Sequence, residues 1–389
     1  MAIETQGAAG DATPLEQSVR GALATVQDPE IHRPITDLGM VKSVEIGEGG
    51  AVRVAVWLTV SGCPMRDTIT SRVTEAVGRV PGVTAVEVEL DVMSDEQRRE
   101  LSTMLRGGTA EREIPFAKPG SLTRVYAVAS GKGGVGKSSV TVNVAAALAA
   151  DGLKVAVVDA DIYGHSVPRM LGVDGRPTQV ENMIMPPSAH DVKVISIGMF
   201  TPGNAPVVWR GPMLHRALQQ FLADVYWGDL DVLLLDLPPG TGDIAISVAQ
   251  LVPNAEILIV TTPQQAAAEV AERAGTIALQ THQKIVGVIE NMSGMPCPHC
   301  DEMVDVFGTG GGRTVADALT RATGAEVPVL GSIPIDVRLR EGGDEGKPVV
   351  LSDPDSPAGA ALRAVAAKLG RRERGLAGLS LGLTPRNKF

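Results

Sequence analysis

A glycine-rich run with two lysines is the strongest candidate for chemistry in this chain. It reads Gly131-Lys132-Gly133-Gly134-Val135-Gly136-Lys137-Ser138-Ser139, between the apolar stretch 125–129 and the Ala- and Val-rich stretch 140–150. Glycines let such a loop turn its backbone N–H groups onto phosphate oxygens, and the helix that follows adds its positive end. We therefore expect residues 133–139 to bind the phosphates of ATP.

The two residues after the last glycine have distinct predicted roles. Lys137 is placed to reach the β- and γ-phosphates, and the Ser138 hydroxyl to ligate Mg²⁺. A glycine-rich turn with a chance lysine and serine is the alternative. The apolar strand before the loop and the helix after it favour a phosphate-binding loop.

Acidic residues follow the ends of two later apolar strands. Asp159 and Asp161 follow residues 155–158, and Asp236 follows residues 232–235. Strand ends of this kind face the ligand crevice of an open parallel sheet. We expect Asp161 to orient the attacking water, Asp159 to help hold the metal, and Asp236 to hold Mg²⁺ through water. Because loop acids are often helix caps, that alternative stays open for the first two.

Two further segments complete the predicted nucleotide site. Residues 238–243, Pro-Pro-Gly-Thr-Gly-Asp, form a rigid turn that suits a switch loop near the γ-phosphate. Asn291 follows the apolar run 285–289, where its amide can pair with the edge of a base. Its alternative role is that of a turn residue.

A cysteine pair lies just past Asn291, in Cys297-Pro298-His299-Cys300. A pair of cysteines with this spacing in a cytosolic protein can bind a metal, act as a redox pair or occur by chance. The pair does not open a helix after a strand, as a thioredoxin-type redox pair does. Zinc and iron–sulfur clusters both need about four ligands, which two facing protomers would supply. His299 or Cys63 could instead complete a site within one chain.

Composition restricts the class of protein. A net charge of −10 argues against broad nucleic-acid binding. No apolar run approaches the roughly 18 residues of a membrane span, and the first residues lack the features of a secretory signal. Three cysteines cannot form a disulfide framework. We therefore expect a cytoplasmic protein that binds neither nucleic acid nor a membrane.

The elements that must position these residues fall into two domains. Residues 13–91 read helix, strand, strand, helix, strand, with Thr13 as a helix cap and alternating apolar residues over 51–60. From residue 122, strands that are apolar on both faces alternate with helices, which is typical of an α/β domain whose mostly parallel sheet lies between helix layers. The expected parts are a disordered N-terminus (1–12), a small α+β domain (13–93), a linker with room for one short helix (94–120), a P-loop ATPase domain (121–370) and a flexible tail (371–389).

Lys132, the early lysine of K-G-G-x-G-K-S, resembles the deviant Walker A lysine of the MinD/ParA-type ATPases. In that family it reaches across a dimer interface and neutralises charge that develops on the partner's nucleotide. Lys132, Lys137 and Asp161 then form the predicted catalytic set. The alternative for Lys132 is a solvated loop lysine.

The motifs together resemble the Mrp/ApbC-type iron–sulfur cluster carrier ATPases. In order, they are GKGGVGKSS, VVDADIYGHSVPRMLG, WRGPM, LLLDLPPGTGD, TTPQ, ENMSGMPCPHC and GSIPID. The resemblance implies a homodimer with an ATP in each protomer and a [4Fe-4S] cluster bridged by Cys297 and Cys300 of both chains. It also implies transfer to apo iron–sulfur proteins, work with other cluster-assembly proteins, and a nucleotide contact from Pro334. One departure is Gly164-His165-Ser166, where Gly-Pro-Ser is usual.

The small domain resembles the SufT-like domain often fused in front of Mrp proteins. The similar segments are Asp28-Pro29-Glu30-Ile31, Asp37-Leu38-Gly39-Met40-Val41 and Ser61-Gly62-Cys63-Pro64. That family is tied to iron–sulfur maturation and has a cysteine at the place of Cys63. We expect Cys63 to be a reactive thiol that binds iron transiently; the alternative is a small buried apolar residue.

Two other functions stay open. A MinD/ParA-like positioning ATPase has no use for a CxxC pair, and it usually ends in an amphipathic helix or shows basic faces. A zinc-bridged structural dimer is the other alternative, because zinc and iron share the tetrathiolate spacing.

Overall fold

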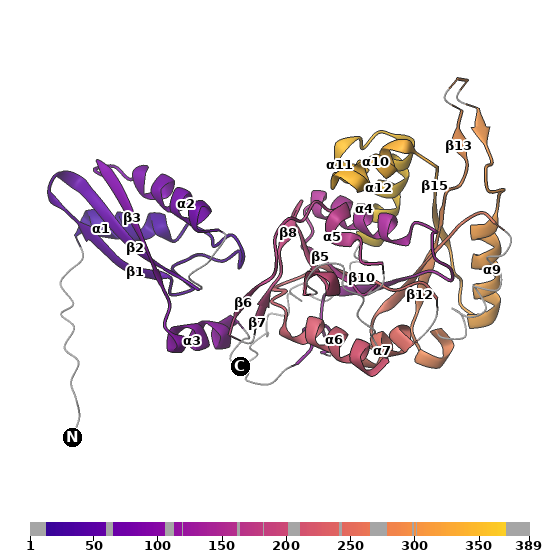
Figure 1. The fold of residues 1–389 in the computed structure, drawn as a ribbon, viewed down its shortest axis with the longest axis horizontal. Coiled ribbons are helices and arrows are strands. Elements are labelled where there is room, and N and C mark those ends of the chain that lie inside the picture. Colours follow the sequence, from indigo (N-terminus) through magenta and orange to yellow (C-terminus); the bar gives the residue numbers. More distant parts are fainter. Residues whose placement is uncertain are drawn as a thin grey trace, which may run out of the picture. The chain divides into compact units, whose positions relative to one another are not determined.

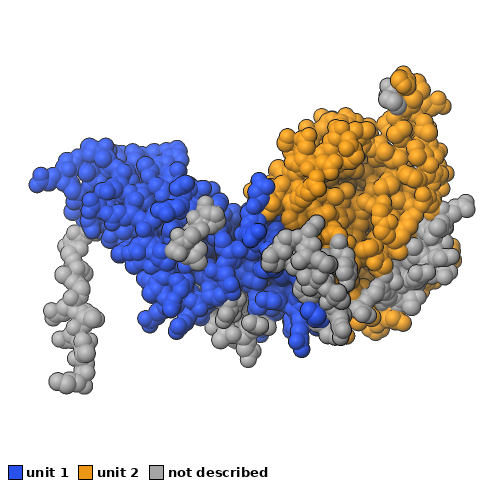
Figure 2. Space-filling model, viewed as in Figure 1, with its two compact units in different colours: residues 1–121, 174–188, 193–229 blue, residues 122–173, 189–192, 230–389 orange. Residues whose placement is uncertain are grey.

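The structure is a computed structural model. It describes residues 13–59, 65–105, 113–118, 120–161, 164–181, 183–200, 211–240, 243–264, 278–297, 299–300 and 302–370. The N-terminus (1–12), the tail (371–389) and Cys63 therefore lie outside the described residues. The chain divides into two compact units, one of residues 1–121, 174–188 and 193–229 and one of residues 122–173, 189–192 and 230–389 (Figure 2).

The first unit begins with a three-stranded sheet and two helices. The elements are α1 (Pro14–Leu23), β1 (Val41–Ile46), the 3-10 turn η1 (Glu48–Gly50), β2 (Ala51–Leu58), α2 (Arg66–Gly78) and β3 (Ala85–Val92) (Figure 1). Strand β2 is central, with β1 antiparallel and β3 parallel to it. The predicted order of helix, strand, strand, helix, strand is confirmed.

Local sequence explains these elements. The Thr13 hydroxyl accepts a hydrogen bond from the Glu16 N–H at 3.2 Å, and Pro14 occupies the first turn of α1, so Thr13 caps the helix as predicted. The Glu16 carboxylate, the other half of a capping box, accepts a hydrogen bond from Arg20 instead. Alternate residues of β2 point into the core, and the buried ones include Val52, Val54, Val56 and Leu58. This period of two matches the pleat of a strand with one covered face.

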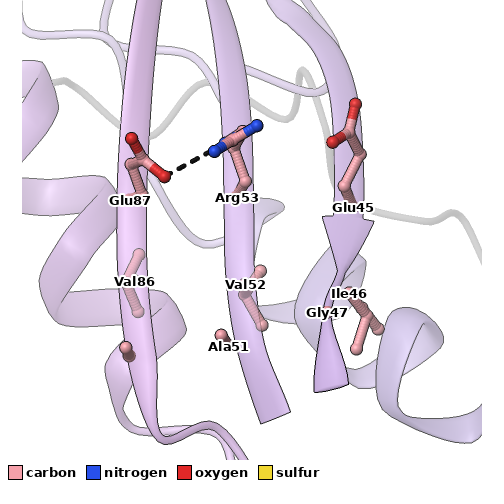
Figure 3. A pocket seen from close by; sticks show the side chains of 9 residues that line it. Glu45, Ile46, Gly47, Ala51, Val52, Arg53, Val86 and Glu87 are labelled. Carbon is pink, nitrogen blue, oxygen red and sulfur yellow. Dashed lines mark hydrogen bonds and ion pairs between the residues drawn. The ribbon is translucent and has the colours of Figure 1, made fainter. Parts of the chain in front are cut away.

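The other face of this sheet is open and charged. Arg53 donates a hydrogen bond to Glu87 at 3.0 Å, and Glu45 is the register partner of Arg53 on β1 (Figure 3). These residues border a hollow of about 390 Å³. Because Arg53 and Glu87 are half exposed or more, their ion pair stabilises the fold little. None of the predicted site residues lines this hollow.

The segment predicted as a linker contains a packed helix, α3 (Asp95–Leu105), and a 3-10 turn, η2 (Pro115–Ala117). Leu101 is 1% exposed and shares an apolar core with the hairpin of β6 (Thr178–Val180) and β7 (Met183–Met185). Arg98 of α3 also pairs with Glu181, between those two strands, at 3.4 Å. Burial of Leu101 favours a fixed position for α3, so this half of the segment is more than a spacer.

An eight-stranded sheet contains the parallel core of the larger domain. Its strands are β4 (Arg124–Ala129), β5 (Val155–Asp159), β8 (Ser188–Ala189), β9 (Val192–Ser196), β10 (Val232–Asp236), β11 (Glu256–Thr261), β12 (Ile285–Asn291) and β15 (Val329–Ile333). Their spatial order is β15-β12-β11-β4-β10-β5-β9-β8. The strands from β15 to β5 pair in parallel, which confirms the predicted mostly parallel sheet.

Helices alternate with these strands along the chain. Those described are α4 (Lys137–Ala150), α5 (Val167–Met170), η3 (Ile197–Met199), α6 (Gly211–Asp224), α7 (Asp243–Leu251), α9 (Gly311–Thr323), α10 (Val337–Glu345), α11 (Val349–Ser352) and α12 (Pro357–Gly370). Helix α4 packs against α12, and α12 against β15. Helices α4 and α12 lie on one side of the strands and α7 on the other (Figure 1). All residues of β5 and β10 are buried, as strands between two helix layers must be.

A small hairpin, β13 (Met295–Pro296) and β14 (Met303–Val304), projects from the second unit after β12 (Figure 1). Backbone hydrogen bonds anchor its base to the end of β15, from Ser293 to Ile333 and from Ile335 to Gly294. Within the described part of the chain, no helix is long and apolar enough to cross a membrane.

Candidate functional site

The glycine-rich loop connects β4 to α4 at the carboxyl edge of the sheet. Gly136 directly precedes α4 and has a φ of 79°, a left-handed conformation that favours glycine. A Cβ placed on Gly136 would lie 2.2 Å from Nδ2 of Asn291, far inside contact distance. Both the backbone and the available space therefore require glycine at this position.

Lys137 and Asp236 meet at the start of α4. The Lys137 ammonium lies 2.7 Å from Oδ2 of Asp236, and the two side chains are 6% and 1% exposed. The Ser138 hydroxyl donates a hydrogen bond to the same carboxylate oxygen at 2.6 Å. Lys137, Ser138 and Asp236, which the sequence predicts to share one site, therefore lie together.

Thr141 is a site residue that the sequence analysis missed. Its hydroxyl donates to Oδ1 of Asp236 at 2.7 Å, so it fixes the second oxygen of that carboxylate. The signal was a hydroxyl residue one helical turn after Lys137 in a largely apolar stretch, since residues four apart lie on one helix face.

The oxygen donors here fit the predicted Mg²⁺. Mg²⁺ prefers hydroxyl, carboxylate and phosphate oxygens, and the Ser138 hydroxyl and Asp236 carboxylate converge at this point. The Lys137 ammonium compensates the buried charge of Asp236 in this structure.

The predicted acids at the end of β5 lie beside Asp236. Asp159 is its register partner on the neighbouring parallel strand, and both residues are fully buried. The Asp159 carboxylate accepts hydrogen bonds from the N–H groups of Asp161 at 3.2 Å and Val167 at 3.3 Å. Asp161 accepts one from the Gly164 N–H at 3.0 Å. Both acids therefore stabilise the loop that leads to α5, and their predicted catalytic roles stay predictions.

Asn291 connects the phosphate-binding loop to the last residue of β12. Its side-chain N–H donates to the Val135 carbonyl at 2.8 Å, and Asn291 is 3% exposed. Asn291 therefore braces the loop in this structure, and its pairing with a base stays a prediction. Pro334 follows β15, the strand next to β12, so it lies at the same edge of the sheet.

Lys132 contacts a residue of its own chain. Its ammonium donates a hydrogen bond to the side-chain oxygen of Gln264, which lies just past the end of β11. Unlike Lys137, Lys132 forms no ion pair with any residue that the structure describes. In the sequence, Gln264 is the last residue of the TTPQ motif.

The two cysteines lie on the β13–β14 hairpin. Cys297 is half-buried, Cys300 is exposed, and both are free thiols. Hydrogen bonds from the His299 N–H, the Cys300 thiol and the Cys300 N–H lower the pKa of Cys297, which favours the metal-binding thiolate. Over the described ranges, no group of three His, Cys, Asp or Glu side chains could hold a metal ion. Two thiols are fewer than the roughly four ligands that a zinc site or an iron–sulfur cluster takes.

Known families match both domains. Residues 121–370 match the family described as NUBPL iron-transfer P-loop NTPase. The chain belongs to this family of iron–sulfur cluster carrier P-loop NTPases. Residues 16–90 match the iron–sulfur cluster assembly protein family, so the carrier has an assembly-type domain at its N-terminal side. The predicted resemblance to Mrp/ApbC-type carriers is confirmed.

Individual relatives of this carrier agree with the family. The iron–sulfur cluster carrier protein of Mycobacterium tuberculosis is 68% identical over 371 residues, which cover 95% of this chain and 97% of the relative. That of Mycobacterium leprae is 64% identical, over 96% of this chain and 98% of the relative. A solved nucleotide-binding protein from Archaeoglobus fulgidus, in complex with ADP, is 35% identical over 65% of this chain and 92% of its own, with a TM-score of 0.49.

Proposed function

We propose that this carrier hydrolyses ATP, holds a [4Fe-4S] cluster between two copies of the chain, and delivers it to apo-proteins. The observation that carries the proposal is the incomplete ligand set on the β13–β14 hairpin. Each chain supplies Cys297 and Cys300, whereas a cluster of this kind takes about four thiolates. A second copy supplies the missing pair.

Exposed apolar side chains beside the cysteines support a homodimer. Three residues that follow the pair, Met303, Val304 and Val306, are 53%, 46% and 49% exposed. Apolar side chains that gather on a projecting hairpin are favoured at protein interfaces, where burial stabilises association. The partner's hairpin would cover them and keep water from the cluster.

The nucleotide site supplies the parts of a phosphoryl-transfer centre. Lys137 provides the countercharge for the β- and γ-phosphates, and Ser138 and Asp236 would hold Mg²⁺, which neutralises charge on the phosphates when it is bound. Asp161 orients the attacking water. Lys132 acts on the nucleotide of the other protomer, where it stabilises charge that develops only in the transition state.

Asn291 provides a mechanical connection between the two sites. Its side chain contacts the phosphate-binding loop at Val135, and six residues later the same segment reaches Cys297. A nucleotide that shifts the loop therefore shifts the base of the cysteine hairpin. ATP binding and hydrolysis would in this way favour different hairpin positions, and so different cluster affinities.

Anaerobic reconstitution tests this function. The purified chain is loaded with iron and sulfide, and iron, acid-labile sulfide and oligomeric state are measured together. We expect about four iron and four sulfide per dimer, the content of one [4Fe-4S] cluster. Tightly bound zinc without labile sulfide would support the zinc-bridged alternative. A full cluster on a monomer would overturn the bridging site.

Cys63 has a proposed part in delivery. A thiol on the assembly-type domain could bind cluster iron briefly and release it to a client that offers more ligands. Comparison of Cys63→Ser with wild type, equally loaded, tests this role. Equal rates of transfer to an apo-acceptor would show that Cys63 is not needed for delivery.

A further inference from the structure

Lys132 and Gln264 come from neighbouring strands at one edge of the sheet. Lys132 lies in the loop after β4, and Gln264 lies three residues past the last residue of β11, Thr261. Because β4 and β11 pair in parallel, their following segments emerge side by side. The hydrogen bond between the two side chains spans this gap.

Hydrogen bonds hold the backbone on either side of Lys132 in this structure, so its side chain is the part that moves most easily. The Ser130 hydroxyl donates to the Lys132 carbonyl at 3.2 Å. The Gly240 N–H donates to the Ser130 carbonyl at 2.8 Å, which ties the same stretch to the predicted switch turn. A new position for the Lys132 ammonium therefore needs only side-chain rotation and the loss of one hydrogen bond.

The two lysines of the loop are held in different ways. Lys137 faces a buried carboxylate, and separating that pair leaves an uncompensated buried charge. Lys132 faces a neutral amide, and both it and Gln264 are half-buried, so water can replace either partner. Lys137 is thus fixed in its own site, whereas Lys132 is held reversibly.

We propose that Gln264 is a positioning residue that holds Lys132 within its own protomer until the dimer forms. Release of this hydrogen bond lets the ammonium reach the nucleotide of the second copy. The proposal rests on the proposed function, since it requires a lysine that acts across the dimer. In this proposal Gln264 controls how often the Lys132 ammonium is free to reach the second protomer. Gln264 itself makes no contact with ATP.

Two substitutions of Gln264 give opposite expectations. Gln264→Leu removes the acceptor at similar size, so the steady-state ATPase rate should rise, by roughly three- to tenfold, the range for one ordinary hydrogen bond that water can replace. Gln264→Glu replaces the amide with a carboxylate and strengthens the hold on Lys132, so the rate should fall by a similar factor. Nucleotide affinity and melting temperature should stay near wild type.

The same substitutions in a Lys132→Ala background provide the control. Without the ammonium, Gln264→Leu and Gln264→Glu should leave the residual rate unchanged. If both lower the rate alike, or act equally without Lys132, Gln264 has only a structural role and the proposal is overturned. Gln264→Asn, which keeps the amide on a shorter stem, should behave like Gln264→Leu and replaces it if that variant fails to fold.

The results of these experiments also distinguish a failure of the proposed role of Gln264 from a failure of the proposed function of Lys132. A Lys132→Ala protein with the wild-type ATPase rate would refute the crossing lysine, and the role of Gln264 with it. A slow Lys132→Ala protein, together with Gln264→Leu and Gln264→Glu proteins that retain Lys132 and hydrolyse ATP at the wild-type rate, would overturn the role of Gln264 alone. Cluster content per dimer is measured independently of both.

Discussion

The ammonium of Lys137 and the carboxylate of Asp236 lie 2.7 Å apart, and both are almost entirely buried. The same two groups are those expected to hold ATP and Mg²⁺. Binding of ATP and Mg²⁺ through these groups would rearrange the ion pair, and a buried charge that loses its partner is costly.

Replacement of Lys137 by Ala should abolish ATP hydrolysis and weaken nucleotide binding. It should also lower the free energy of unfolding by about 3–5 kcal/mol, because Asp236 is left buried without its partner. Urea denaturation and nucleotide titration measure the two effects.

The double variant Lys137→Ala/Asp236→Asn separates stability from binding. It should regain most of the lost stability, since residue 236 no longer carries a buried charge without a partner, yet it should still fail to bind ATP. A double variant as unstable as Lys137→Ala would show that the ion pair is not the cause.

Lys132→Ala should bind ATP nearly as well as wild type but hydrolyse it more slowly, by roughly 10²-fold or more, because its role lies in the transition state. In hybrid dimers with Asp161→Ala, one active site would combine an intact Asp161 with a Lys132 from the other chain, and some activity should return. Well-formed hybrids without any recovery would count against the crossing lysine.

Gly136→Ala should destabilise the phosphate-binding loop more than Gly134→Ala. Both glycines have a φ of 79°, so both substitutions strain the backbone by roughly 1–2 kcal/mol. Only a Cβ at Gly136 would overlap Asn291, and nothing lies within 4 Å of one at Gly134. The overlap adds roughly 1–3 kcal/mol, which thermal unfolding without nucleotide would show. Equal losses in the two variants would mean that Asn291 can move aside.

Cys297→Ala should retain ATP binding and lose the reconstituted cluster. A dimer of this variant has two thiolates left, half of the usual shell. His299→Ala is the matched control from the same hairpin, and it should load normally. Iron and sulfide contents close to wild type in Cys297→Ala would refute the bridging model.

Asp28→Asn should stabilise the small domain at neutral pH and leave its stability in acid unchanged. Burial raises the pKa of Asp28, although hydrogen bonds from the Ile31 and Glu30 N–H groups oppose the shift. An acid with a raised native pKa binds its proton more tightly when folded, so its contribution to stability is complete at low pH and is lost as the pH rises through that pKa. The side-chain amide oxygen of the Asp28→Asn variant can still accept both hydrogen bonds.

Melting curves between pH 4 and pH 8, a range that spans ordinary carboxyl titration, measure the difference between Asp28→Asn and wild type. The gain should grow with pH. A gain that is the same at every pH would exclude ionisation of Asp28 as its cause.

The sequence alone determined the fold class and the core of the nucleotide site. Apolar runs marked the parallel strands, and their carboxyl ends placed Asp159 and Asp236 at one edge, where the structure pairs them in register. The glycine spacing of the loop located Lys137 and Ser138 as well. These features are local or follow from strand direction, so periodicity and motif order were enough.

Only the tertiary structure decided which side chains meet from distant segments. Thr141 contacts Asp236 across 95 positions, Asn291 contacts Val135 across 156, and Gln264 contacts Lys132 across 132. Likewise, Leu101 in the predicted linker is buried in an apolar core that also includes residues of the β6–β7 hairpin. Such contacts depend on strand order and on the space between packed elements, and neither leaves a periodic trace in one sequence.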